Sequence, residues 1–487
     1  MDYRSDSSRL AVVSCEPIRT PQESAAVTCD QAIFTCIRSD LGQGYRIVGA
    51  SSGLHHAESA EIASRSPSGD GLCDNTPAAV GVAFAPLSTG RYAVLHSTYA
   101  GKEPTGRGGL RVYTRAFILS ADALRRFHNN PFDVLRAAEA AGLLRVDLAP
   151  ARTLPPVTLT AGIRTAGSCF APAMNRVGHV WITHCVEKLL SNETVIVHAT
   201  GDLPAVAEAV LLSVPGILRP AIPLSAGVRF SIARLGRLTV INGEAARTQQ
   251  AVRGRSLTFA DTTRTPPHPP EHPWALAVQC FLTSERTDRL LSLTGDAFDE
   301  ADVAELERIG NACLDLHNLD TAQPAEVIDT AAVYLDRPVR CPLGETLSRR
   351  IIERARGRLN TLLSQAGAGE LAEIWRDLTP PPGSSPQIIC FASEVARLAI
   401  ARMSGLAPLE AIRMTIEATD RGWFAHAPEE LGRVANRVVA RVAAWAASAA
   451  ATEMDAARSR LAAWCRRFPN DTAASQLLSS IDRRLDG

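Results

Sequence analysis

Cys36 is the residue of this sequence best suited to nucleophilic chemistry. A thiol becomes a strong nucleophile when a histidine takes its proton, and the candidate partners for Cys36 are His96 and His184. No cysteine-protease signature surrounds Cys36, and in the strand-like stretch QAIFTCI a cysteine is most often a buried core residue. A cysteine-dependent hydrolase or nucleotide-processing enzyme is therefore kept as an alternative hypothesis.

Gly42 and Gly44 raise the question of a phosphate-binding loop, because they form the start of a G-x-G-x-x-G fingerprint. The third glycine of that fingerprint would fall at Ile47. The surrounding stretch YRIVGA is typical of a strand, whereas the fingerprint needs a helix there. We therefore predict a hairpin, in which glycine supplies the positive φ of the turn.

The connection AGKEPTGRGG is a second glycine-rich segment, and it is cationic. It contains Gly101 followed by Lys102, but Glu103 stands where a Walker A motif requires Ser or Thr, so we predict no nucleotide cofactor. Positive charges at Lys102, Arg107 and Arg111 lie in or beside it. A solvated loop explains them, and the functional alternative is a contact for an acidic partner or for a nucleotide held by another protein.

The histidines show no metal-binding spacing. His179 and His184 lie in HVWITHCV, which we predict as a strand, and at five residues apart they would point from opposite faces. The triplet His56-Ala57-Glu58 matches the first half of a zinc deaminase signature, but the second half, P-C-x-x-C, is missing. We predict no metal site.

Composition sets wider limits on function. The chain has 487 residues, enough for about three domains, and its 51 basic and 51 acidic residues give no overall attraction for nucleic acid or anionic membranes. No apolar run reaches the roughly 18 residues of a membrane span. The 11 cysteines are scattered without a C-x-x-C pair, which indicates reduced thiols and a cytoplasmic location.

Alternating and helical patterns divide the chain into two halves. We predict an α+β protein, with a mixed α/β N-terminal half of two β-containing segments and an all-helical C-terminal half. In the first segment we expect strands at QAIFTCI, YRIVGA, 91–99 and 111–119, and helices after Ser120 and at 131–144. In the second we expect strands at HVWITHCV and TVIVHAT, a helix at 203–214, and a hairpin turning at residues 235–236.

Proline-rich stretches mark the expected domain boundaries. The ranges are a loosely ordered lead-in at 1–28, an N-terminal α/β domain at 29–150, a middle α/β domain at 151–262, a linker at 263–274, and helical domains at 275–379 and 380–487. In the last domain, Arg433, Arg437 and Arg441 recur every four residues and form a basic stripe. Nucleic-acid binding through this stripe is a second alternative, although stacking aromatic residues are scarce there.

The order of motifs in the first half resembles the N-terminal domain, type 2, of the bacterial GTPase-associated proteins. The likeness rests on Phe34-Thr35-Cys36, on Ser51-Ser52-Gly53-Leu54, and on a later pattern of Tyr99, Gly101, Gly106, Arg107 and Gly109. A weaker likeness to the middle domain of that family extends it to about residue 245, through IPLSAGVRFSIARLGRL. With Gly42 and Gly44, the glycines of these motifs are expected to form structural turns.

This resemblance implies a protein encoded beside a small GTPase in a bacterial multi-protein system linked to conflict or defence. It implies an adaptor and supplies no catalytic residues. We therefore expect a non-enzymatic adaptor or scaffold that binds protein partners, among them a small GTPase. The first contact region is expected at the strands of 91–119 and the connection carrying Lys102, Arg107 and Arg111.

Overall fold

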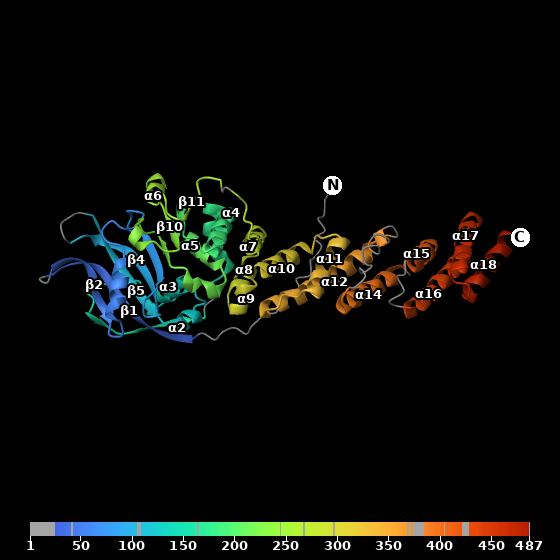
Figure 1. Ribbon diagram of the computed structural model, residues 1–487, viewed down its shortest axis with the longest axis horizontal. Coiled ribbons are helices and arrows are strands. Elements are labelled where there is room, and N and C mark those ends of the chain that lie inside the picture. The colour runs from blue at the N-terminus through green and yellow to red at the C-terminus, as the bar shows by residue number, and fades with distance from the viewer. Residues whose placement is uncertain are drawn as a thin grey trace, which may run out of the picture. The chain divides into compact units, whose positions relative to one another are not determined.

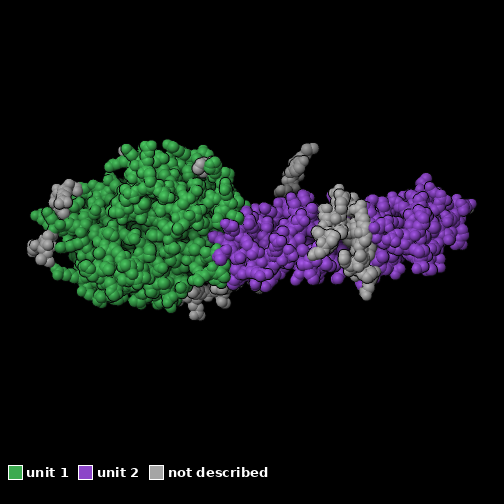
Figure 2. Space-filling view, viewed as in Figure 1, with its two compact units in different colours: residues 1–303 green, residues 304–487 purple. Residues whose placement is uncertain are grey.

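The chain divides into two compact units, Met1–Val303 and Ala304–Gly487, here called unit 1 and unit 2 (Figure 2). The computed structural model describes residues 25–486 apart from positions 40–41, 105–108, 163–164, 244, 266–267, 296–297, 368–369, 372–373, 375–383, 404 and 421–427. All strands of the described chain lie in unit 1, and unit 2 is helical.

Unit 1 is built on one mixed sheet of eleven strands (Figure 1). Their order across the sheet is β11-β8-β10-β9-β3-β4-β5-β1-β2-β6, and β7 also pairs with β1. The strands are β1 (Ala25–Ser39), β2 (Gly42–Ser51), β3 (Val80–Pro86), β4 (Tyr92–Lys102), β5 (Leu110–Leu119), β6 (Thr153–Leu154), β7 (Val157–Ala161), β8 (Val195–His198), β9 (Leu224–Ala226), β10 (Leu238–Ile241) and β11 (Thr258–Asp261).

This sheet has an antiparallel half and a parallel half. Strands β2, β1, β5, β4 and β3 pair antiparallel with one another, whereas β9, β10, β8 and β11 pair parallel with one another. The short edge strand β6 pairs parallel with β2. The halves meet where β3 pairs antiparallel with β9, from Val82↔Ala226 to Phe84↔Leu224. The ladder of backbone hydrogen bonds therefore continues from one half into the other.

Helices cover this sheet, and the first of them buries part of one face. Helix α1 (His56–Arg65) buries Ile62 against Ala32, Leu95 and Ala116, which lie on one face of the antiparallel half. The other helices up to the unit boundary are α2 (Ala121–Arg126), α3 (Pro131–Ala140), α4 (Phe170–Leu190), α5 (Leu203–Leu212), α6 (Ala245–Ala251), α7 (Pro273–Thr283), α8 (Thr287–Thr294) and α9 (Glu300–Ala304), with 3₁₀ turns η1 (Gly167–Cys169), η2 (Gly216–Ala221) and η3 (Ile232–Arg234).

An ion network ties α1 to the sheet. Arg91, beside β4, donates to Asp30 of β1 at 2.6 Å and to both carboxylate oxygens of Glu58, whose side chain is fully buried. Burial alone would raise the pKa of Glu58, but hydrogen bonds from Arg91, Thr89 and the His55 backbone outweigh it and lower the pKa to about 2. The charged form of Glu58 is thus part of the folded structure.

Two predictions for the second segment are wrong. The stretch HVWITHCV lies in helix α4, whose buried residues Val177, Trp181, Ile182 and Cys185 follow a helical period that extends well beyond those eight residues. The expected hairpin at residues 235–236 is also absent, because β9 and β10 run parallel with Leu238 opposite Leu224. The 3₁₀ turn η3 lies between them and reverses the chain before β10 begins.

Unit 2 is a stack of helices in which each helix packs against the next helix along the chain or the next but one. Several helices begin at a proline, whose fixed φ and missing N–H suit the first helical position. The helices are α10 (Leu306–Asn318), α11 (Pro324–Asp336), α12 (Pro342–Gln365), α14 (Pro386–Met403), α15 (Pro408–Asp420), α16 (Pro428–Ala446), α17 (Ala451–Arg467) and α18 (Thr472–Leu485).

The predicted α+β class, with a helical C-terminal half, is confirmed. The predicted domain ranges stay a prediction, and we note that β1 begins at Ala25, within the expected lead-in, and that the sheet extends across residues 150–151. Among the described residues, no helix is both long enough and apolar enough to cross a membrane.

We predict that Arg91→Met lowers the free energy of unfolding of unit 1 by about 3 kcal/mol at pH 7, because it leaves a buried carboxylate without its cation. The change is measured from hydrogen–deuterium exchange of β1 and β4 peptides in a urea series. Arg125→Met is the control, because the exposed Arg125–Asp122 pair should contribute under about 1 kcal/mol.

The effect of Arg91→Met on stability should depend on pH. The folded-state pKa of Glu58 lies below its ordinary value of 4.5, so its stabilising effect is complete above that pH and is lost as pH falls toward about 2. The difference between wild type and Arg91→Met should therefore shrink over this interval. A difference that stays constant down to pH 2.5 would contradict the assigned role of the ion network.

Candidate functional site

Cys36 lies on β1, opposite Tyr45 of β2, and is fully buried. Its thiol donates to Glu103 Oε1, with 3.6 Å between sulfur and oxygen. Burial raises the pKa of this thiol, and the Glu103 carboxylate raises it further. Both effects disfavour the thiolate, which is the opposite of what a nucleophilic cysteine needs.

The register of the sheet separates Cys36 from His96. Thr35 pairs with Tyr113, which pairs with Thr98, so these three residues share one face. His96 is two residues from Thr98 and lies on this same face. Cys36 is next to Thr35 and points from the opposite face. The predicted pairing of Cys36 with His96 is therefore wrong, and burial lowers the pKa of His96 to about 4.

His184 is also separated from Cys36. It lies on α4, which packs against β8 and β11 at the parallel end of the sheet, and its ring meets Trp181 edge-on at 5.7 Å between centroids. Strands β8 and β1 are six positions apart in the sheet order, which corresponds to about 29 Å. The alternative of a Cys36–His184 pair is wrong for this reason.

The connection between β4 and β5 has a fixed base. Lys102, the last residue of β4, is exposed, and it pairs with Leu110 at the start of β5. Asp70 accepts from Leu110 N at 2.8 Å, and a side chain at Gly109, where φ is +89°, would meet the same carboxylate. Gly109 therefore acts as a turn residue that allows Asp70 to approach.

The other residues predicted for this contact region have mixed outcomes. Arg111 is half-buried and donates through Nε and Nη2 to the carbonyl of Ala100, so its charge is held against the sheet. Gly101 is exposed, with φ of +81°. Gly106 and Arg107 lie outside the described residues. The structural turn expected at Gly106 and the partner contact expected at Arg107 stay predictions.

The remaining predicted turn glycines lie near β2. Gly42 and Gly44 belong to β2 itself, and the hairpin with β1 is closed by the pair Ser39↔Gly42. Gly44 has φ of +136°, which supports the expected backbone freedom. At Gly53, a Cβ atom would lie 2.7 Å from a carboxylate oxygen of Asp30, so a larger residue would disturb the Arg91 network.

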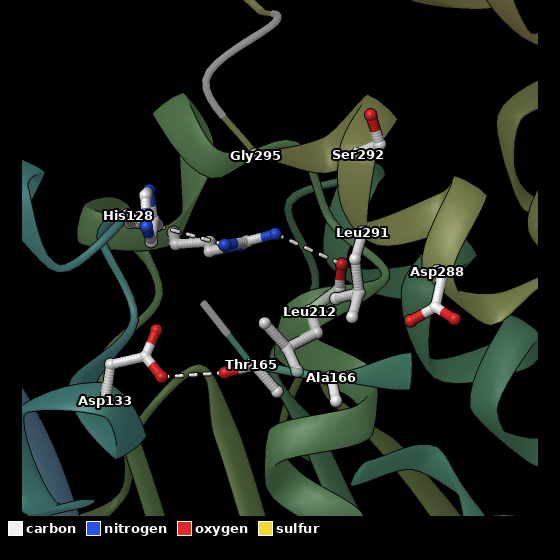
Figure 3. A pocket seen from close by; sticks show the side chains of 10 residues that line it. His128, Asp133, Thr165, Ala166, Leu212, Asp288, Leu291, Ser292 and Gly295 are labelled. Atoms are coloured by element: carbon white, nitrogen blue, oxygen red, sulfur yellow. Dashed lines mark hydrogen bonds between the residues drawn. The ribbon is translucent and has the colours of Figure 1, made fainter. Parts of the chain in front are cut away.

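A cavity of about 280 Å³ lies among α3, α8, η2 and the segment before η1 (Figure 3). Figure 3 shows Asp133 with Thr165 beside it, joined by a hydrogen bond of 2.7 Å, and Asp288 on the other side of the view. The volume is close to the lower end of the range for small-molecule sites. The lining residues are His128, Asp133, Thr165, Ala166, Leu212, Arg219, Asp288, Leu291, Ser292 and Gly295.

The polar groups of this cavity are largely engaged by the protein itself. Arg219 is buried and donates to four backbone carbonyls, those of Val214, His128, Leu212 and Thr294. It thereby fastens the segments after α2, α5 and α8 to one another. These contacts give Arg219 a structural role in unit 1.

A salt-bridge cluster closes one side of the cavity. Arg136 on α3 contacts Asp133 at 2.7 Å and Glu208 of α5 at 2.6 Å, and it donates to Thr165. Burial would lower the pKa of Arg136, but the hydrogen bonds that Arg136 donates to Glu208 and Asp133 raise it well above its ordinary value. The cluster therefore holds α3 and α5 together through salt bridges.

His198 and Asp261 meet at the carboxyl ends of parallel strands β8 and β11, where α/β sheets commonly bind ligands. His198 Nδ1 lies 3.2 Å from Asp261 Oδ1, an arrangement that can orient a catalytic base. Its Nε2, however, lies 2.8 Å from the carbonyl oxygen of Gly243. That nitrogen is engaged within the fold, so the pair connects three strand ends.

In the described part of the chain, no group of three or more His, Cys, Asp or Glu side chains is placed to hold a metal ion. His179 and His184 share helix α4 rather than a strand, with a break in helical geometry at Gly178 just before them. Five residues on a helix correspond to about 140° of rotation, so these two side chains still point apart.

The N-terminal part of unit 1 has the element order β1, β2, α1, β3, β4 and β5, and Lys102 is the last residue of β4. Residues 28–160 match the family model of GTPase-associated protein 1, N-terminal domain type 2. The resemblance predicted for this part of the sequence is confirmed. The matched segment runs from β1 to β7 and contains both Cys36 and Lys102.

The match ends at residue 160, so the likeness expected for the middle region up to residue 245 stays a prediction. Neither the curated proteins nor the solved structures gave a match to this chain. The matched family is described as GTPase-associated.

The C-terminal basic stripe lies on α16 of unit 2. Arg433 and Arg437 are exposed, and Arg441 is half-buried. Val434 and Val438 of the same helix are buried. Nucleic-acid binding by the stripe stays a hypothesis.

We predict that Cys36 reacts slowly with iodoacetamide. At pH 8 in the native protein, the exposed Cys390 should be alkylated at least about tenfold faster, because the Cys36 thiol is buried and its pKa is raised. Peptide mass spectrometry over a time course measures both rates. If Cys36 were among the fastest thiols to react, the nucleophile hypothesis would have to be restored.

Proposed function

We propose that this protein is a non-enzymatic adaptor that docks onto a small GTPase, or onto proteins acting with it, in a bacterial conflict or defence system. The observation that carries the proposal is the match of residues 28–160 to a GTPase-associated domain. The geometry around Cys36 adds support. The thiol is buried, its pKa is raised, and neither of the two predicted histidine partners faces it, which disfavours the cysteine-enzyme alternative.

The contact region of this proposal is the β4–β5 connection. Lys102 is exposed at the end of a strand whose base is held by the hydrogen bond from Leu110 to Asp70. When a partner binds Lys102, the backbone loses little conformational entropy, because the end of β4 that carries this lysine is already ordered. An acidic surface on the partner would complement Lys102 and speed the encounter.

Unit 2 supplies a second surface in this proposal. Stacked helices that contact only near neighbours expose a long succession of helix faces, and proteins built this way commonly use such surfaces for binding. A cytoplasmic location belongs to the same proposal. It is supported by the described cysteines, all of which are free thiols.

The proposal predicts that Lys102→Glu weakens capture of the GTPase encoded beside this protein by roughly fivefold to tenfold, because it puts a like charge against an acidic surface. Affinity is measured by biolayer interferometry with the tagged full-length protein at two salt concentrations. The melting temperature should stay nearly unchanged, since exposed substitutions usually alter stability by about 0.5 kcal/mol or less.

Arg126→Glu is the matched control, because Arg126 is an exposed cation of the same domain on α2, away from the connection. It should capture the GTPase as well as wild type does. Equal loss in both variants would indicate a general charge effect. Capture unaffected by Lys102→Glu would remove the β4–β5 connection from the contact region, and no capture by wild type would contradict the adaptor proposal.

A further inference from the structure

Three arginines from separate segments of unit 1 surround one small hollow. Arg65 is the last residue of α1, Arg229 follows β9, and Arg234 ends the turn η3. Helix α1 contacts η3, which brings the first and third of these together across a large separation in sequence. Among the described residues, none of the three guanidinium groups forms an ion pair with a carboxylate within 4.0 Å.

Arg234 is the most constrained of the three. Its Nε is buried and has no hydrogen-bond partner in the described structure, and its Nη2 reaches only the carbonyl of Arg229 at 3.5 Å, a long contact. Burial lowers the pKa of Arg234 because the charged form is partly removed from water. A buried donor of this kind calls for an acceptor that comes from outside.

Arg229 and the floor of the hollow complete the site. Arg229 is held by bonds from Nε to the carbonyl of Leu72 at 3.2 Å and from Nη2 to Asn75 Oδ1 at 3.1 Å. The floor carries the hydroxyl groups of Ser225 and Thr239, from β9 and β10, which lie 3.4 Å apart. The site thus combines three positive charges with two hydroxyl groups.

The size of the hollow limits what can enter it. Its volume is about 10 Å³, which is near the minimum for one water molecule and therefore for one oxygen atom. A ligand must place a single oxygen inside and keep its other oxygens at the rim, where the arginines are. A phosphate group suits this arrangement better than a carboxylate, because its additional oxygens can accept from several guanidinium groups at once.

We propose that Arg65, Arg229 and Arg234, with Ser225 and Thr239 beneath them, form a binding site for a phosphate group. One phosphate oxygen enters the hollow and accepts from Arg234, and the remaining oxygens are bound by the other two arginines. A bound phosphate places negative charge among the three arginines that line the hollow. This proposal does not rest on the adaptor function.

Isothermal titration calorimetry with inorganic phosphate on the full-length protein tests the site, with sodium chloride keeping the ionic strength constant. Wild type should bind phosphate with a stoichiometry near one. Arg234→Gln should weaken binding by about tenfold or more, as expected for the loss of one charge-assisted hydrogen bond. Arg229→Gln, at an exposed position, is the second variant and keeps the test valid if Arg234→Gln fails to fold.

Arg237→Gln is the matched control. Arg237 is also half-buried, and burial lowers its pKa too, but it donates to the carbonyl of Leu189 at 2.6 Å and does not line the hollow. Its phosphate affinity should equal that of wild type. No phosphate binding by wild type, or binding equally weakened in the control, would overturn the proposal. Acetate binding as tightly as phosphate would overturn the assignment to phosphate.

Discussion

The antiparallel pairing of β3 with β9 is the contact on which unit 1 depends, because it joins two half-sheets of different construction. Three register pairs, from Val82↔Ala226 to Phe84↔Leu224, form this junction. Gly227, the next residue, has φ of +73°, and a Cβ there would lie 2.1 Å from the carbonyl oxygen of Val80. The two halves can approach only because that side chain is absent. The three-arginine hollow lies at this junction, with Ala83 from one half and Thr239 from the other in its lining.

In unit 1, the guanidinium groups of several arginines hold separate helices and strands together. Arg91 joins α1 to β1 through two carboxylates, Arg136 joins α3 to α5, and Arg219 binds backbone carbonyls from three segments. A planar group with five donors can satisfy several acceptors at fixed angles. Unlike Arg91 and Arg136, the residues Arg65, Arg229 and Arg234 have no carboxylate partner among the described residues.

Local patterns explain which elements could be predicted. Strands β1, β2, β4 and β5 are rich in β-branched and aromatic residues. Helices α2 and α5 begin at side chains, Ser120 and Asp202, that accept from the helix backbone. Helix α1 was not predicted, because His55 precedes it and Ile62 is its main apolar contact with the core. Helix α4 was missed because its period becomes visible only over about twenty residues.

The site was less accessible to sequence reasoning than the fold. Which face Cys36 occupies relative to His96 depends on the pairing of β1 with β5 and of β5 with β4, and no short motif records it. The meeting of Arg65 with Arg234 requires the pairing of β3 with β9, which is equally non-local. Lys102 could be singled out because its charge, its glycine neighbours and its place between two strands are all local features.

The near-neighbour packing of unit 2 has a consequence for how the chain acquires its structure. Contacts between helices that are adjacent in sequence close short loops, so little chain entropy opposes their formation, whereas β1 must meet β7 more than a hundred residues later. Helices of the C-terminal stack can therefore assemble quickly from any point along it. On the ribosome, the sheet has its long-range partners available by the time β11 has emerged, and the helices of unit 2 are then added one at a time.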